Sequence, residues 1–342
     1  MFFFGSKNRV GLDMGTDSIK VAESQGGKKI VYFAIFPINL PEEPFDSEIR
    51  LKRKSDLLKQ IYKERNLKEK NIFTSVEDES VMVKYLELPR LSRDELNVAL
   101  PIEIDRMFPF QMDEIIINQK SVDVLSGDKS KIAIVISAIP KSIVNEMRSL
   151  FSIQSSLSAE KISVPSTIAL GKTNTFSEYH RGDQLVMLID IGFRYTNVAL
   201  CKDNVIYHSR YFSLGGKNFT ESFVTSKRVT FKEAEKIKCD YDIRLDRDTH
   251  FNATLDSWSK EIKRTLKFYK VRLTSNPLDV STVLLSGGGA RIKGLAEFIS
   301  AQVNTETKYD QLNIPGLSRT QKDLDSDSDE MLLMKVAVGL VL

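Results

Sequence analysis

Three short glycine-bearing segments carry the residues that could do chemistry in this chain. They are residues 11–16 (GLDMGT), 190–192 (DIG) and 286–290 (SGGGA). Each follows an apolar run that predicts a buried strand. Glycines after a strand let backbone N–H groups approach a phosphate without an intervening Cβ, and successive N–H groups form an anion-binding concavity. Together the three segments predict a site for a phosphate chain.

Asp13 and Asp190 stand at the ends of two of these strands. A carboxylate repels phosphate, but it can hold Mg²⁺, usually through water, and Mg²⁺ then bridges to phosphate oxygens. The first two segments share one layout of strand, Asp, apolar residue, Gly and small or polar residues. This repeat predicts two related halves that close on one nucleotide, with Asp13 and Asp190 flanking one metal ion. The triple glycine at 287–289 suits a flat adenine or ribose.

Each segment alone is weak evidence, because Asp-x-Gly at a strand end is more often a simple turn. The order, spacing and strand context of all three are more specific. No residue announces itself as the base that would activate water. Glu103, on a predicted helix, is a candidate, and a solvent-facing carboxylate is the alternative. The three histidines share no metal-ligand spacing, which argues against a zinc site.

Composition bounds the class of protein. A length of 342 residues predicts two domains, and 42% hydrophobic with 28% charged residues is ordinary for a soluble globular protein. The net charge of +3 gives no indication of a nucleic-acid partner, and we predict none. Cys201 and Cys239 form no CxxC pair, which favours a reducing compartment. No apolar run approaches the roughly 20 residues of a membrane helix.

The elements that must position these segments follow from hydrophobic periodicity and turn signals. Ser92 and Glu95 form a predicted capping box at the start of one helix. We expect the polar residues 171–184 to link two halves, and the acidic residues 323–330 to form a solvated loop. The predicted strands span 9–13, 18–24, 29–37, 72–76, 82–88, 115–124, 131–138, 161–164, 185–189, 197–202, 204–212 and 280–285. The predicted helices span 47–65, 92–108, 141–151, 219–225, 230–239, 255–273, 293–302 and 331–342.

The chain resembles the actin-like ATPase superfamily and, within it, the PilM family of type IV pilus assembly proteins, which is related to FtsA. GLDMGTDSIK and LIDIGFRYTNVAL match the two phosphate motifs, and LLSGGGARIKGLAEFI matches the adenosine motif. AEKIK, residues 234–238, matches a helix that faces the nucleoside in relatives. The features closest to the PilM family are RYFSLGGKNFT (210–220), LPRLSRDELNVALPIEIDRMFPF (88–110) and the closing AVGL. The resemblance covers essentially the whole chain.

This resemblance implies an α/β fold of the actin-like ATPase type, a duplicated ribonuclease H-like arrangement with two lobes around a nucleotide cleft. Residues 1–79 would form the first part of subdomain 1A, and residues 80–160 an inserted α+β subdomain, 1C. The chain would return to 1A over 161–185 and form the second lobe (2A and 2B) over 186–330. Residues 331–342 would be the C-terminal helix of 1A.

The resemblance also implies ATP or ADP as cofactor, with Mg²⁺ held at Asp13 and Asp190, mainly through water. Asp17 stands in the first phosphate loop, where relatives mostly have small polar residues, and Arg194 stands where many have Gly or Ser. We therefore expect nucleotide binding with at most weak ATPase activity. The implied nucleotide-binding residues are Asp13, Gly15, Thr16, Ser18, Lys20, Asp190, Gly192, Gly215, Gly216, Glu235, Lys238, Gly287, Gly288 and Gly289.

Proteins of this family are cytoplasmic scaffolds held under the inner membrane by the N-terminal tail of PilN. The implied partners are that tail, the PilN/PilO/PilP complex indirectly, the pilus motor ATPases and, through self-association, a second copy. The tail groove would involve residues 82–88 and 92–110, with residues 108–110 (FPF) as either an anchor or buried core. Two alternatives stay open. One is an FtsA-like cytoskeletal or cell-division protein. The other is a sugar kinase of the same superfamily, although no sugar-binding cluster is evident.

Overall fold

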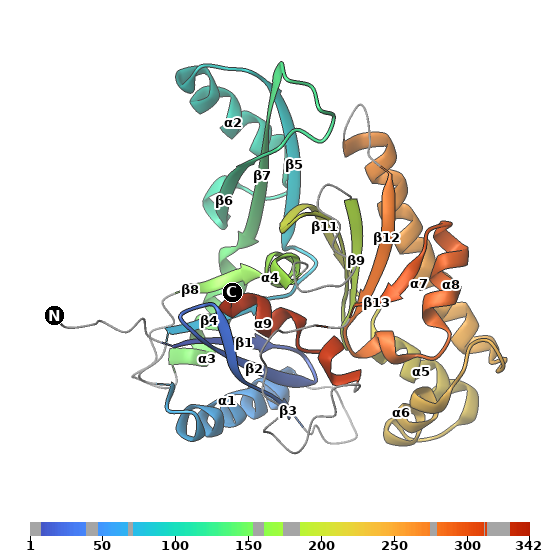
Figure 1. Ribbon diagram of the computed structural model, residues 1–342. Helices are drawn as coiled ribbons and strands as arrows, with labels where there is room; N and C mark the ends of the chain where they lie inside the picture. The colour runs from blue at the N-terminus through green and yellow to red at the C-terminus, as the bar shows by residue number, and fades with distance from the viewer. Residues whose placement is uncertain are drawn as a thin grey trace.

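Two β-sheets with helices packed on them make up the fold (Figure 1). The computed structural model describes residues 8–38, 47–67, 71–152, 161–173, 185–273, 279–310, 312 and 329–342. Among these residues, no helix is both long enough and apolar enough to cross a membrane. The predicted acidic loop at 323–330 lies almost wholly outside the described residues.

The first sheet has the strand order β3-β2-β1-β4-β8. The strands β1, β2 and β3 form an antiparallel meander, whereas β4 runs parallel to β1 and β8 runs parallel to β4. Because β1 and β4 are parallel neighbours, the segments that follow them leave the sheet at one edge. The bounds are β1 (Arg9–Met14), β2 (Ser18–Gln25), β3 (Lys29–Pro37), β4 (Asn71–Val76) and β8 (Lys161–Pro165).

The second sheet repeats this plan with the order β11-β10-β9-β12-β13. Here β9, β10 and β11 are the antiparallel meander, β12 runs parallel to β9, and β13 runs parallel to β12. The duplication places β9 where β1 lies in the first sheet. The bounds are β9 (Leu185–Ile191), β10 (Thr196–Lys202), β11 (Val205–Phe212), β12 (Val280–Ser286) and the short β13 (Thr307–Tyr309), which the sequence analysis missed.

Three further strands and α2 (Arg93–Met107) form the unit at the top of Figure 1. These strands are antiparallel and extend the second sheet in the order β11-β5-β7-β6, joined to it by the pairing of Ser209 with Val83. The predicted capping box is confirmed, since the Glu95 N–H donates to Ser92 Oγ and the Ser92 N–H donates to the Glu95 carboxylate. The strands are β5 (Met82–Pro89), β6 (Ile115–Val122) and β7 (Lys131–Pro140), with a 3-10 turn at Met112–Glu114.

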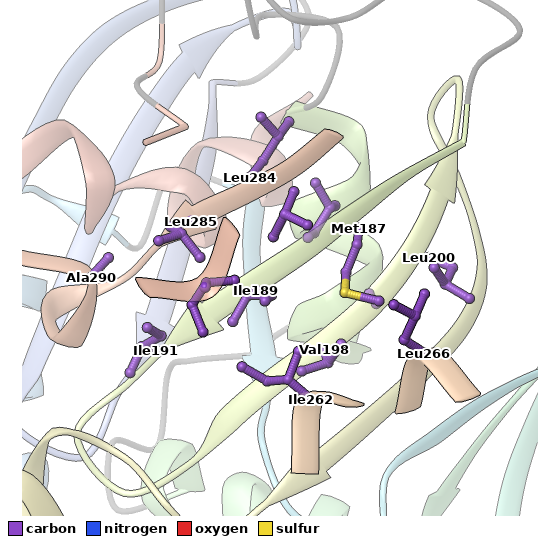
Figure 2. Close-up of a cluster of buried hydrophobic side chains, with 14 of the residues drawn as sticks. Met187, Ile189, Ile191, Val198, Leu200, Ile262, Leu266, Leu284, Leu285 and Ala290 are labelled. Carbon is purple, nitrogen blue, oxygen red and sulfur yellow. The ribbon is translucent and has the colours of Figure 1, made fainter. Parts of the chain in front are cut away.

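The largest hydrophobic core lies under the second sheet (Figure 2). The central strand β9 is buried at nearly every position, because neighbouring strands flank its edges and helices pack against the sheet. Figure 2 shows Ile189 of β9 and Val198 of β10 beside Ile262, which belongs to α7 (Thr249–Phe268). This helix begins six residues before the predicted Leu255, because the Asp248 carboxylate accepts from the first N–H groups of the helix.

Two short helices, α4 (Ser166–Thr173) and α9 (Lys335–Val341), pack on each other at the centre of the molecule. A Cβ on Gly339 would lie 1.9 Å from the carbonyl oxygen of Ala169, so glycine is required for this approach. The expectation that 171–184 forms a link is wrong for residues 171–173, which end α4. The other residues of that stretch lie outside the described residues. The hydroxyls of buried Ser166 and Thr167 share hydrogen bonds with the Tyr211 hydroxyl, so the polar groups at the start of α4 have partners in the interior.

The remaining helices cover the outer faces. Both α1 (Ser47–Glu64) and α3 (Lys141–Ser152) belong to the first sheet's layer, where Leu58 and Leu150 pack with Leu12. Contacts join α5 and α6, and join α7 to both α5 and α8. Their bounds are α5 (Gly216–Lys227), α6 (Phe231–Asp240) and α8 (Leu295–Val303), with short turns of helix at Tyr269–Leu273, Gly288–Arg291 and Asp329–Leu332.

Candidate functional site

A cavity of about 420 Å³ lies where the glycine segments meet. Segments that follow β1, β9 and β12 contribute to its wall, together with α6 and the segment before α9. All the predicted nucleotide-binding residues except Gly215 line this cavity. They are Asp13, Gly15, Thr16, Ser18, Lys20, Asp190, Gly192, Gly216, Glu235, Lys238, Gly287, Gly288 and Gly289.

The first phosphate segment holds a buried ion pair. Asp13 is buried at the end of β1, and its carboxylate lies 3.2 Å from Lys20 Nζ, on the paired position of β2. Burial lowers the pKa of Lys20, the Asp13 charge raises it, and the net shift is upward. Lys20 therefore stays protonated and sits close to Gly15, whose added Cβ would lie 2.7 Å from Lys20 Nζ. A phosphate bound at this loop would meet both backbone N–H groups and this ammonium.

The second phosphate segment is held by hydrogen bonds to its neighbours. Asp190 accepts from Ser286 Oγ at 2.8 Å, which ties the end of β9 to the end of β12. The Gly192 carbonyl accepts from the Gly216 N–H at 2.9 Å. Gly215 does not line the cavity, because it packs beneath the loop, where an added Cβ would lie 2.7 Å from the Gly192 carbonyl oxygen. Its place in the fold is to support this loop.

The negative charge of Asp13 acts on the carboxylate of Asp190. Burial raises the pKa of Asp190, the Ser286 hydrogen bond lowers it, and the Asp13 charge raises it. Two repelling buried carboxylates are stabilised by a divalent cation between them. No group of three His, Cys, Asp or Glu side chains able to hold a metal occurs among the described residues. The donor set therefore fits Mg²⁺ only if water and phosphate oxygens supply its other ligands.

The side of the cavity formed by the third glycine segment and α6 has a turn and a polar cluster. The Gly287 N–H donates to the Leu332 carbonyl at 2.9 Å, and Gly287 has a φ of +82°, which favours glycine. On α6, Lys238 Nζ lies 2.7 Å from the Glu235 carboxylate and 2.9 Å from Thr220 Oγ1. This cluster fixes a carboxylate and an ammonium at the mouth of the cavity. Both groups are suited to polar contacts with a ribose.

Glu77 is a site residue that the sequence reasoning missed. It follows β4 and lines the cavity. Burial and the charges of Asp13 and Asp190 together raise the pKa of Glu77 to about 8, against the opposing charges of Lys20 and Lys54. A signal was available, because an acidic residue directly follows a strand predicted to be buried, as Asp13 lies at the end of β1. Other residues missed in the wall are Arg291, Lys293, Tyr309 and Leu333.

The two residues that depart from the family pattern lie in different places. Asp17 is exposed and lines the cavity, and its carbonyl accepts from the Ile38 N–H at 2.9 Å. Arg194 does not line this cavity but a neighbouring one. Glu103 lies on α2, is paired with Arg106 at 3.0 Å, and lines neither cavity. The structure therefore does not bring Glu103 together with the other predicted residues.

The family model described as type IV pilus assembly protein PilM matches residues 11–342. The chain belongs to the PilM family. Among solved structures, it is similar to the PilM-PilN type IV pilus biogenesis complex, with a TM-score of 0.73, 20% identity, and coverage of 97% of this chain and 97% of that chain.

Two more distant structures have the same overall fold. The ethanolamine utilization protein EutJ from Carboxydothermus hydrogenoformans has a TM-score of 0.50 and 14% identity, covering 98% of this chain and 90% of that chain. MreB5 of Spiroplasma citri bound to ADP has a TM-score of 0.50 and 14% identity, covering 98% and 95%. The chain thus has an actin-like ATPase fold, as the sequence analysis predicted, and the PilM family assigns it to type IV pilus assembly.

Proposed function

We propose that this chain is an ATP- or ADP-binding scaffold of the type IV pilus inner-membrane platform, with Mg²⁺ bound at Asp13 and Asp190. The observation that carries the proposal is the meeting of three glycine segments around one cavity beside these two carboxylates. MreB5, which shares the fold, is described as bound to ADP. Glu103 lies away from the cavity. We therefore propose at most weak ATPase activity.

The proposed protein partner is the cytoplasmic N-terminal tail of PilN, because a similar solved structure is a PilM-PilN complex. We propose that the tail docks on the unit built from α2, β5, β6 and β7. On α2, Val98 and Ile102 are 68% and 50% exposed and stand four residues apart on one face. Phe108, in contrast, is buried in the core of this unit, so the buried reading of residues 108–110 is favoured for it.

The second sheet connects the cavity to the proposed partner surface, and this connection supports coupling between nucleotide binding and peptide binding. Asp190 lies in β9, and the second sheet runs from β9 through β10 and β11 to β5. Nucleotide closure that moves this sheet would therefore also move the unit that carries α2. A bound nucleotide would change partner affinity by as much as its own affinity differs between the two states.

Through PilN, we propose indirect contact with PilO and PilP, contact with the motor ATPases, and a peripheral position at the cytoplasmic face of the inner membrane. The FtsA-like alternative would require nucleotide-dependent filaments. Match to the PilM family over residues 11–342 favours the pilus role. Self-association stays a prediction, and so do the subdomain boundaries at 79, 160, 185 and 330.

The test is calorimetric titration of Mg-ATP into the full chain, with and without a synthetic peptide of the PilN N-terminal tail. We expect each to bind and to change the affinity of the other. The double variant Val98→Asp/Ile102→Asp should lose peptide binding and keep Mg-ATP binding. Asp190→Asn should lose Mg-ATP binding and keep peptide binding. Binding of nucleotide with no binding of peptide would refute the partner assignment and favour the FtsA-like reading.

A further inference from the structure

A second cavity, of about 520 Å³, lies beside the nucleotide cleft. Asp13, Thr16, Glu77 and Phe193 line both cavities, so the two meet at the phosphate loops. The rest of the second cavity's wall comes from the ends of β1 and β4, from α1 and α3, from the loop between β9 and β10, and from the start of α5. A group placed at the end of a bound phosphate chain would face this cavity.

Basic side chains from both halves of the molecule converge on this second cavity. Arg50 and Lys54 are four residues apart on one face of α1, and Arg194 comes from the loop after β9. Lys54 Nζ donates to the Met14 carbonyl at 3.1 Å, directly after Asp13. The Arg50 guanidinium lies 5.9 Å from the centre of the Phe193 ring. Lys54 and Arg50 are therefore held beside the phosphate loops, whereas Arg194 is exposed at the rim and its guanidinium lies 4.9 Å from the centre of the Tyr195 ring.

These cations destabilise one another. Burial lowers the pKa of Arg50, and the positive charge of Arg194 lowers it further, while Asp17 raises it. Burial lowers the pKa of Lys54 to about 8, against the charges of Glu77 and Asp13. Like charges gathered in a partly dry site favour a bound anion, because the anion offsets their repulsion.

The acidic residues of the same wall oppose an anion only in part. Asp78 is engaged by Ser80, whose N–H and hydroxyl both donate to it. The positive charges of Lys20 and Lys54 act on Glu77. Asp13 and Glu146 complete the acidic set, and Asp13 is paired with Lys20 at 3.2 Å.

Apolar side chains also line the second cavity. They are Leu51, Ile143, Met147 and Leu150. Apolar surface beside a bound anion lowers the local polarity and strengthens its attraction to the basic groups.

We propose that the second cavity is a phosphate-binding site in which Arg50, Lys54 and Arg194 hold a tetrahedral phosphate next to the nucleotide cleft. The phosphate is either free inorganic phosphate or the terminal phosphate of a nucleoside triphosphate. The second source rests on the proposed nucleotide site, whereas the first does not, because the basic wall exists without a nucleotide.

The probe is inorganic phosphate, titrated into the full chain and followed by phosphorus NMR, without nucleotide and with saturating Mg-ADP. We expect phosphate to bind, and Arg194→Ala or Lys54→Met to weaken it about tenfold or more, the size of one lost charge-assisted hydrogen bond. The control is Arg53→Ala, an exposed residue of the same helix that lines neither cavity, which should leave phosphate affinity unchanged. Thermal unfolding checks that each variant folds.

Comparison of nucleotides separates the two sources. If Arg194→Ala weakens ATP but not ADP, the site holds the terminal phosphate. If phosphate and Mg-ADP bind together and the variant affects only phosphate, the site holds the free ion. Failure of ATP and ADP to bind, with phosphate still bound and lost in Arg194→Ala, would sink the nucleotide proposal and keep this one. Two results together would overturn the proposed phosphate site. Phosphate would bind neither without nucleotide nor with Mg-ADP, and the ratio of ATP affinity to ADP affinity would be the same in Arg194→Ala as in the unaltered chain.

Discussion

Lys20 Nζ lies 3.2 Å from the carboxylate of Asp13, its direct partner across the β1–β2 ladder. The pair places one positive and one negative charge at the first phosphate loop, with Gly15 beside them. An ammonium already held in place by a carboxylate needs little reorganisation to bind a phosphate. This geometry is therefore suited to the proposed binding of a nucleotide with Mg²⁺.

Lys20→Met should weaken ATP binding about ten- to hundredfold, which corresponds to the loss of a hydrogen bond to a charged group. Lys29→Met, an exposed change on β3 outside the cavity, is the control and should bind normally. Calorimetric titration measures both. Normal ATP affinity in Lys20→Met would mean that Lys20 serves only to neutralise Asp13.

Replacing Gly289 by Ala should lower the thermal midpoint, because the new Cβ would lie 2.3 Å from Ile191 Cγ2 in the packed core. Overpacking of this kind costs about 1–3 kcal/mol. Gly288→Ala is the matched control, since the atom nearest to its added Cβ is Leu333 Cδ2 at 4.0 Å. Equal midpoints for the two variants would show that β9 yields to the extra methyl group.

Lys335→Met should destabilise the fold by about 3–5 kcal/mol, because it leaves Asp310 buried without its cation. Lys335 of α9 contacts Asp310, which follows β13, and both side chains are 1% exposed. The double variant Lys335→Met/Asp310→Leu should recover much of the lost stability in urea unfolding. A double variant no more stable than the single one would argue against coupling of the pair.

His208 should make the protein less stable as the pH falls from 6.5 to 4. Burial, together with the charges of Lys84 and Arg210, lowers the pKa of His208 to about 4. The unfolded chain takes up a proton near pH 6.5 and the folded chain does not, so acid favours unfolding, by at most about 3 kcal/mol at pH 4. The ring stacks on Phe268 with centroids 5.0 Å apart.

His208→Phe keeps an aromatic ring and removes this proton. Urea unfolding at pH 7.5 and pH 5 should therefore show a smaller loss of stability in His208→Phe than in the unaltered chain. His250→Gln, an exposed change, should lose as much stability as the unaltered chain. The same acid sensitivity in His208→Phe would assign the effect to other groups.

The sequence by itself determined the elements around the three glycine segments and most of the residues that line the cleft. Apolar runs, turn residues and the Ser92–Glu95 capping box act between near neighbours in the chain, so their outcome is readable from local pattern. Strands β1 and β9 each have Asp as the second-last residue and a glycine two positions after it, and this repeat predicted two related halves.

Only the tertiary structure decided what depends on partners distant in the chain. The polar start of helix α4 is buried, and Tyr211 satisfies Ser166 and Thr167 there by hydrogen bonds from a distant strand. Glu77 enters the cleft because β4 pairs with β1, and Arg194 faces Arg50 because α1 packs beside the loop after β9. These placements depend on packing and on electrostatic interactions between residues far apart in the chain. A local sequence pattern does not predict such distant contacts.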